Sequence, residues 1–262
     1  PDPASRYNPD DVHGASEVIN PAAHVWHDAA WRGRPWHEAV IYEIHVGAFS
    51  PHGDFAGVMA RLDELAELGV TALELMPVAD FPGARNWGYD GVLPYAPDST
   101  YGRPEALKAL IDAAHQRGLM VLLDVVYNHF GPDGNYLHVY AQRFFNPQRV
   151  TPWGPAINYA EPVVRAFFLH NALYWLEEYH LDGLRLDAVH VLYAADGLVP
   201  RSRIDHRLQV DAVLRVFGKC GHAPLGLVQS FLVAQLLRPR FFRAQVRVVD
   251  VLRVGGRRGA IH

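Results

Sequence analysis

The segment "GLRLDAVH" (183–190) carries two residues that together could form a covalent bond with a substrate. Arg185 stands two residues before Asp187, so on a strand both side chains point to the same face, with the guanidinium beside the carboxylate. This arrangement keeps a carboxylate ionised and aimed, as a nucleophile requires. A second segment, "DVVYNH" (124–129), holds Asp124 and His129, which could converge on the same pocket.

The elements that would position these segments are alternating strands and helices. A lead-in without sustained periodicity covers residues 1–36, and four apolar runs with three amphipathic repeats between them follow it. The predicted strands cover 39–46, 71–77, 119–129 and 183–187, and the predicted helices cover 54–69, 103–118 and 161–180. This β-α-β-α-β-α-β order predicts a parallel α/β fold with both polar segments at the carboxyl ends of strands. Pattern alone does not separate a (β/α)8 barrel from a doubly wound sheet, since both place sites there.

The loops between these elements are rich in aromatic residues. Their flat, amphipathic rings could stack on the apolar faces of sugar rings, or they could form the small hydrophobic cores that long loops need. Both interpretations remain open for the set as a whole. Trp87 and Tyr89 favour sugar binding, because Gly88 between them permits a tight backbone turn. The six loop aromatics are Trp87, Tyr89, Tyr95, Tyr101, Trp153 and Tyr159.

Composition and motif content exclude several classes of protein. The hydrophobic share of 50% and the charged share of 20% are ordinary for a globular protein. The single Cys220 excludes an internal disulfide framework and suits a reducing compartment, so we expect a cytoplasmic location and no membrane partner. No H-E-x-x-H motif and no phosphate-binding glycine loop occurs, so we expect no metal and no cofactor. The chain opens on Pro1 without Met, from which we expect a fragment.

In combination and in this order, "DVVYNH" and "GLRLDAVH" resemble the first two conserved regions of glycoside hydrolase family 13, the α-amylase family. "YEIHVGAFSPHGDFAGV" (42–58) and "ELMPVADFPGARNWGYDGVLPYAP" (74–97) are similar to the branch that contains glycogen branching enzymes and trehalohydrolases. "PDPASRYNPDDVHGASEV" (1–18) is similar to the segment before the barrel in the trehalohydrolases. The resemblance covers roughly residues 1–195 and implies a (β/α)8 barrel of the TIM-barrel type.

The resemblance also implies a role for each matching residue. Asp187 matches the catalytic nucleophile, Arg185 the arginine that orients it, and Asp124 an aspartate that supports the network through that arginine. His129 and Tyr89 match groups that contact the glucose at the cleavage site. Trp87 joins them as a predicted substrate contact. The implied reaction is double displacement with retention at the α-1,4 bond next to the terminal trehalose of a malto-oligosyltrehalose, which releases trehalose. No redox or nucleotide cofactor is implied.

The resemblance fails after Asp187. In the family a glutamate on the fifth strand protonates the leaving group, yet the last of the ten glutamates here is Glu178. Residues 196–262 hold eleven Arg, one Lys and four Asp, whereas residues 1–195 hold 12 basic and 24 acidic residues. We therefore expect a lead-in over 1–36, the first four βα units of a barrel over 37–195, and an Arg-rich tail over 196–262. A full barrel needs about 250 residues.

Two origins of this tail remain open. It could be an out-of-frame translation that begins near residues 191–196, or a divergent segment that binds acidic partners. In either case we expect a catalytically incomplete chain whose partner is an α-glucan, without nucleic acid. The alternatives for function are a glycogen or α-glucan branching enzyme, which transfers the glucan to a sugar hydroxyl, and a non-catalytic glucan-binding remnant.

Overall fold

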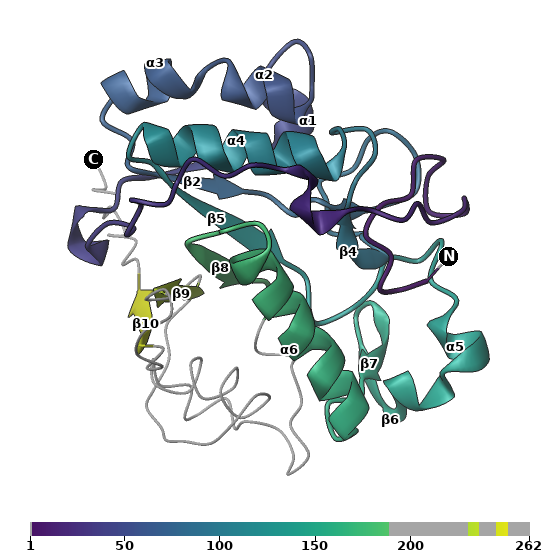
Figure 1. The fold of residues 1–262 in the computed structure, drawn as a ribbon. Helices are drawn as coiled ribbons and strands as arrows, with labels where there is room; N and C mark the ends of the chain where they lie inside the picture. The colour runs from purple at the N-terminus through teal and green to yellow at the C-terminus, as the bar shows by residue number, and fades with distance from the viewer. Residues whose placement is uncertain (1, 189–229, 236–244, 251–262) are drawn as a thin grey trace, which may run out of the picture.

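The computed structural model describes residues 2–188, 230–235 and 245–250 (Figure 1). Most of the Arg-rich tail predicted over 196–262 therefore lies outside the described residues, and so do Cys220 and the start of the proposed frame change.

Four parallel strands form the central sheet, and each agrees with a predicted one. They are β1 (Ile41–Ile44), β2 (Ala72–Leu75), β5 (Met120–Val125) and β8 (Gly183–Leu186), and they are neighbours in that order. Glu43 pairs with Glu74, Glu74 with Leu122, and Asp124 with Arg185. The predicted strand 119–129 ends early, because the residues after Val125 turn away into a loop.

The helices between these strands also follow the prediction, with one difference. Pro104–Gln116 forms α4 and Pro162–Glu177 forms α6, and both begin with the proline at the first helical position. The predicted helix 54–69 is two short helices instead, α2 (Phe55–Met59) and α3 (Leu62–Glu67), which are separated at Ala60 and Arg61. Asp54 caps α2 as expected, since its carboxylate accepts a hydrogen bond from the Gly57 amide at 2.7 Å.

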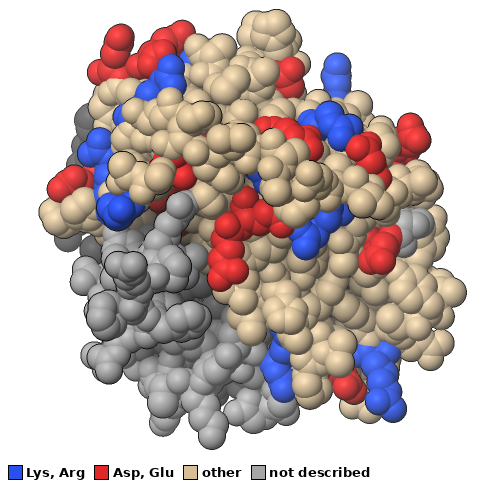
Figure 2. All heavy atoms as spheres, viewed as in Figure 1, with Lys and Arg blue, Asp and Glu red and all other residues tan. Residues whose placement is uncertain are grey.

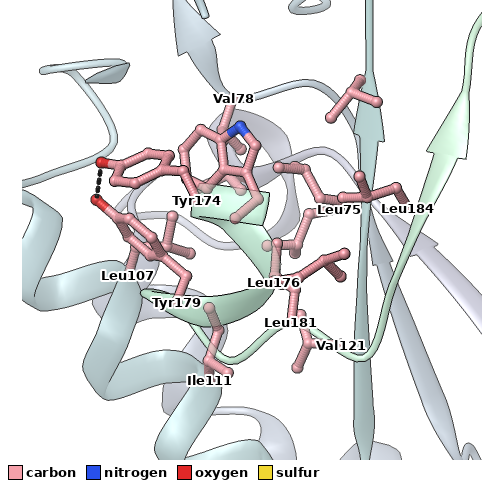
Figure 3. Packing of buried hydrophobic residues seen from close by; sticks show 14 of the residues in the cluster. Leu75, Val78, Leu107, Ile111, Val121, Tyr174, Leu176, Tyr179, Leu181 and Leu184 are labelled. Carbon is pink, nitrogen blue, oxygen red and sulfur yellow. Dashed lines mark hydrogen bonds between the residues drawn. The ribbon is translucent and has the colours of Figure 1, made fainter. Parts of the chain in front are cut away.

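The helices all pack on one face of the four strands. Alternate strand residues enter a single buried cluster with residues of α2, α3, α4 and α6, part of which Figure 3 shows between the sheet and α6. In a doubly wound sheet the helices cover both faces and the strand order reverses at one point. Here the order of the four parallel strands does not reverse, and the described helices between them pack on one face, as in a barrel wall. The strand members of the cluster are Ile44, Leu73, Leu75, Val121, Leu123, Val125, Leu184 and Leu186.

Two further strands continue the sheet beyond β8. Ser230–Gln235 (β9) pairs with β8 in the antiparallel direction, and Gln245–Asp250 (β10) pairs with β9. A (β/α)8 barrel has a parallel fifth strand beside the fourth. The described part therefore holds four parallel strands with three helical connections of barrel type, and the strand beside β8 does not continue the pattern.

The remaining elements are short and belong to the loops. Two antiparallel hairpins stand out: β3 (Ala79–Asp80) pairs with β4 (Leu93–Pro97), and β6 (Phe145–Thr151) pairs with β7 (Gly154–Ile157). Single-turn elements are η1 (Pro21–Ala23), η2 (Trp36–Glu38), α1 (Val46–Phe49), α5 (Leu137–Tyr140) and η3 (Gln142–Phe144).

The lead-in is held against the barrel wall by charged and aromatic contacts. Arg6 Nη1 lies 2.6 Å from Glu178 Oε2, and the buried Lys108 reaches Glu178 Oε1 at 3.1 Å. Asp28 contacts His115 of α4 at 3.1 Å. Figure 2 shows acidic and basic side chains interspersed on the face that carries α3 and α4. That distribution is typical of a solvated surface.

Candidate active site

The polar side chains of the strands lie on the face opposite the helices. Since Asp124 and Arg185 are register partners on β5 and β8, their side chains project from adjacent strands on the same side of the sheet. Both are buried, with 1% and 8% of their surface exposed. Asp187 follows β8 directly, and its amide donates to the Val125 carbonyl at 3.1 Å. The sheet thus brings three predicted site residues to one edge.

Arg185 joins the two carboxylates. Its Nη1 lies 2.5 Å from Asp124 Oδ2 and 3.1 Å from Asp187 Oδ1. Burial disfavours the charged guanidinium, but the Asp124 carboxylate outweighs this and raises the pKa of Arg185. Arg185 therefore stays positively charged between the two acids. The Asp187 side chain keeps 19% of its surface exposed, so this carboxylate is oriented by a cation and still reachable.

Tyr89 adds a second donor to Asp124. Its hydroxyl donates to Asp124 Oδ2 at 3.0 Å. Burial raises the pKa of Asp124 to about 6, although Arg185 and the Tyr89 hydroxyl both favour the ionised form. Burial and the nearby Asp124 raise the pKa of Tyr89, so the phenol keeps its proton and remains a donor.

The backbone around Gly88 determines where Tyr89 points. Gly88 has φ +96°, and a Cβ there would stand 2.0 Å from the Pro77 carbonyl oxygen. Only glycine fits this close approach at the end of β2. The turn that favoured Trp87 and Tyr89 in the sequence is therefore present, and it sends the two rings in different directions. Trp87 is 74% exposed, whereas the hydroxyl of Tyr89 reaches the buried Asp124.

His129 lies beside this network with one nitrogen unpaired. Asn128 Nδ2 donates to His129 Nδ1 at 2.8 Å, so the ring proton of the neutral imidazole sits on Nε2. Burial lowers the pKa of His129 and keeps the ring neutral, although the nearby Tyr89 backbone favours the charged form. Among the described residues His129 Nε2 has no hydrogen-bond partner. This nitrogen is also shielded from solvent, so a contact between it and a sugar stays a prediction.

The loop aromatics divide between the two interpretations. Tyr95, Tyr101 and Tyr159 are buried members of the main core, so for them the sugar-binding interpretation is wrong. They fill the spaces under the long loops. Trp153 is 46% exposed and stacks on His129, with ring centroids 4.5 Å apart and an angle of 11° between the planes. One face of this indole fixes the imidazole while the residue stays accessible.

The structure places three residues at the site that the sequence pattern did not predict. Glu74 on β2 is 4% exposed, and burial followed by the charge of Asp124 raises its pKa to about 8. A glutamate within the apolar run "ALEL" is the signal that could have found it. His45 and Asn86 contact each other beside Tyr89, with His45 Nε2 and the Asn86 carbonyl oxygen 2.7 Å apart.

Within the part of the chain that the structure describes, no group of three or more His, Cys, Asp or Glu residues could hold a metal ion. In the same ranges no helix is long and apolar enough to cross a membrane.

Comparison with known proteins places this geometry in a family. Residues 20–149 match the catalytic domain of the α-amylase family. The chain is 53% identical over 188 residues to malto-oligosyltrehalose trehalohydrolase of Deinococcus radiodurans, which covers 72% of this chain and 31% of that protein. It is 49% identical over 195 residues to the enzyme of the same name from Saccharolobus solfataricus, with 73% and 34% covered. The chain thus spans about a third of the length of these curated relatives.

Other branches of the family match less closely. A 1,4-α-glucan branching enzyme of Shewanella baltica is 38% identical over 202 residues, with 68% of this chain and 27% of that protein covered. A pullulanase of Anoxybacillus sp. LM18-11, solved with maltotetraose, superposes with a TM-score of 0.67 at 27% identity and covers 82% of this chain and 36% of that one.

The fold itself is confirmed by a solved structure. A Salmonella typhimurium protein provisionally assigned as an α-amylase superposes with a TM-score of 0.72 at 49% identity, over 85% of this chain and 37% of that one. The (β/α)8 type predicted from the sequence is therefore correct for the described units. The chain belongs to glycoside hydrolase family 13, the α-amylase family.

Proposed function

We propose that this chain carries the nucleophile half of a trehalohydrolase-type active site. The observation that carries the proposal is the Arg185 bridge between Asp124 and Asp187, which orients a partly exposed carboxylate at the carboxyl edge of the sheet. The names of the relatives that match at about half identity support the substrate: a malto-oligosyltrehalose, cut at the α-1,4 bond next to its trehalose unit.

In the proposed reaction Asp187 attacks the anomeric carbon and forms a covalent glycosyl intermediate, which water then hydrolyses with net retention. Arg185 orients the attacking oxygen. We propose that the Nε2–H of His129 donates to the sugar on this side, while the Tyr89 hydroxyl, whose single proton goes to Asp124, accepts from a sugar hydroxyl. The leaving oxygen must receive a proton from a second carboxyl group about 5–5.5 Å from the first. Because no glutamate follows Asp187 in the sequence, we propose that the 262-residue chain binds the glucan and does not turn it over.

Two measurements on the purified chain test this proposal. Calorimetry with malto-oligosyltrehalose and with a malto-oligosaccharide of equal length compares recognition of the trehalose end, and we expect tighter binding of the former. Chromatography of the same mixture after long incubation looks for trehalose. Release of trehalose would contradict catalytic incompleteness, and equal or absent binding would contradict the substrate assignment.

A branching enzyme is the second candidate, favoured by the 38% identity to the Shewanella baltica enzyme. It shares the nucleophile and differs in the acceptor, which is a sugar hydroxyl instead of water. Incubation with amylose separates the two, because only a branching enzyme introduces α-1,6 links. The third candidate is a glucan-binding remnant that does not catalyse a reaction. It would bind the glucan through Trp87 and Tyr89 and would produce neither trehalose nor α-1,6 links.

A further inference from the structure

We propose that His45 and Asn86 are positioning residues that hold Tyr89 against Asp124. This inference rests on the proposed function, in which Tyr89 and Asp124 serve the nucleophile. It concerns the loop of residues 86–91, called the Tyr89 loop below, and its attachment to β1.

Asn86 organises the Tyr89 loop from within. Its side-chain Oδ1 accepts hydrogen bonds from the amides of Gly88 at 2.8 Å and Asp90 at 3.4 Å. Its Nδ2 donates to Asp90 Oδ2 at 2.8 Å. One side chain thus closes the loop on both sides of Tyr89, an arrangement that asparagine often provides at turns.

His45 ties the closed loop to the end of β1. The Asn86 carbonyl oxygen can only accept, so His45 Nε2, 2.7 Å away, must carry the proton and donate. The hydroxyl of Tyr101 donates a hydrogen bond to the same carbonyl oxygen at 3.5 Å. His45 Nδ1 is buried without a hydrogen-bond partner among the described residues, so the hydrogen bond of this ring is the one that Nε2 makes.

Two neighbouring segments pack closely against the Tyr89 loop and restrict the movement of its backbone. Gly88 packs against the Pro77 carbonyl, and a Cβ on Gly88 would stand 2.0 Å from the Pro77 carbonyl oxygen. On the other side a Cβ on Gly131 would stand 1.9 Å from the Asp90 carbonyl oxygen, and the Gly131 amide donates to the Gly91 carbonyl at 3.1 Å. The loop is therefore wedged between the ends of β2 and β5, and its Tyr89 side chain is directed to Asp124.

These contacts form a continuous series across the carboxyl edge of the sheet. The series runs from His45 after β1 to Asp187 after β8. Hydrogen bonds and ion pairs make every step except the one from Asn86 to Tyr89, which runs through the backbone of the Tyr89 loop that the Asn86 side chain closes. The Tyr89 hydroxyl and Arg185 share the Oδ2 oxygen of Asp124. Loss of the His45 donor would let the loop move and withdraw one of these two donors. Asp124 would then hold Arg185, and through it Asp187, less firmly.

A matched pair of substitutions at residue 45 tests the donor itself. Glutamine places its amide nitrogen near the position of Nε2, whereas asparagine places it near Nδ1. His45→Gln therefore keeps the hydrogen bond to the Asn86 carbonyl and His45→Asn loses it. Asn86→Ala opens the loop independently, and Arg85→Ala is the control, since Arg85 is an exposed neighbour without a partner in the described structure.

The signature to measure is the ¹³C resonance of the Tyr89 Cζ atom in tyrosine-labelled protein, assigned with Tyr89→Phe. This resonance responds to the hydrogen bond of the phenol oxygen. We expect it to move toward the value of free tyrosine in His45→Asn and Asn86→Ala, and to stay in place in His45→Gln and Arg85→Ala. The resonances of the buried Tyr127 and Tyr159 report that each variant is folded.

Affinity for malto-oligosyltrehalose should fall about five- to tenfold in the two loosened variants, the size expected for one lost hydrogen bond. An unmoved Tyr89 resonance in both folded variants would overturn the inference. If the resonance moves as expected while the unsubstituted chain binds no glucan, the positioning role stands and the proposed function fails.

Discussion

Arg185 and Asp187 stand two residues apart on one strand end, and the guanidinium Nη1 lies 3.1 Å from Asp187 Oδ1. The same nitrogen contacts Asp124 on the adjacent strand. One cation thus holds two carboxylates that would otherwise repel each other in a buried site. This arrangement gives the edge of the sheet its chemistry and makes Arg185 the residue on which the site depends most.

Replacing Arg185 should destabilise the chain even when the charge is kept. A lysine ammonium cannot reproduce the fixed geometry of the guanidinium between two acids. We expect Arg185→Lys to lower the free energy of unfolding by about 2 kcal/mol, part of the cost of breaking a buried ion pair. Urea unfolding at pH 7 measures this, with the exposed Arg143→Lys as control. Equal stability of the two variants would show that the bridge contributes nothing.

The Tyr89 loop should not tolerate a side chain at Gly88. Gly88→Ala combines a left-handed φ of +96° with a Cβ 2.0 Å from the Pro77 carbonyl, so backbone must move. We expect a loss of at least about 2 kcal/mol in urea unfolding. Gly83→Ala is the matched comparison, because Gly83 has φ +82° with no atom near the added Cβ, and should lose about 1 kcal/mol. A smaller loss at Gly88 than at Gly83 would contradict the close approach.

Attachment of the lead-in should depend on pH through His115. This buried ring lies between Asp28 and Asp182, at 3.1 Å from each, and stacks on Trp31, while His180 also contacts Asp28. Burial opposes the charge, but the hydrogen bonds to Asp182 and Asp28 raise the pKa of His115. Its stabilisation is therefore full below the unfolded pKa of about 6.5 and disappears as the pH rises through the folded value.

His115→Gln measures this contribution. We expect the variant to be less stable than the unsubstituted chain by roughly 2 kcal/mol at pH 5.5, with a smaller difference at pH 9. His138→Gln is the control, since His138 is exposed on α5. A difference that grows between pH 5.5 and 9 would mean that His115 is neutral in the folded protein.

Glu74 shifts stability with pH in the same direction as His115, over a range that starts at a lower pH. Burial raises its pKa to about 8, above the ordinary value of about 4.3, so the folded state loses stability as the pH rises from about 4.3 to about 8. Glu74→Gln removes this loss, and the variant should gain roughly 1–3 kcal/mol over the unsubstituted chain between pH 5 and pH 8. The exposed Glu67→Gln should show no such gain. A gain independent of pH would show that Glu74 is already ionised at pH 5.

The sequence predicted the four strands and the residues at their ends because these are local signals. An apolar run that ends in "DVV" or "LRLD" indicates a buried strand with a polar end, and this signal does not depend on the rest of the fold. The helix over 54–69 was only partly right, since the break at Ala60 and Arg61 has no breaker residue to announce it.

The contacts that position Tyr89 could not be predicted in the same way. His45 and Asn86 are 41 residues apart in the sequence, and their hydrogen bond exists only because β1 and the Tyr89 loop meet in space. The exposure of Trp153 and the burial of Tyr159 likewise depend on how the loops pack, as both occur in similar aromatic surroundings. The roles predicted for Asp187, Arg185, Asp124, His129, Tyr89 and Trp87 remain predictions.

The most direct test of the account is whether Asp187 acts as a nucleophile in this chain. An α-maltotriosyl fluoride carries a leaving group that needs no proton, so the attack by Asp187 requires no general acid. We predict a stable glycosyl adduct in the intact mass spectrum, mapped by proteolysis to the peptide that contains Asp187 and absent from Asp187→Asn. Absence of the adduct in the folded, glucan-binding chain, or its formation on another residue, would contradict the assignment of Asp187.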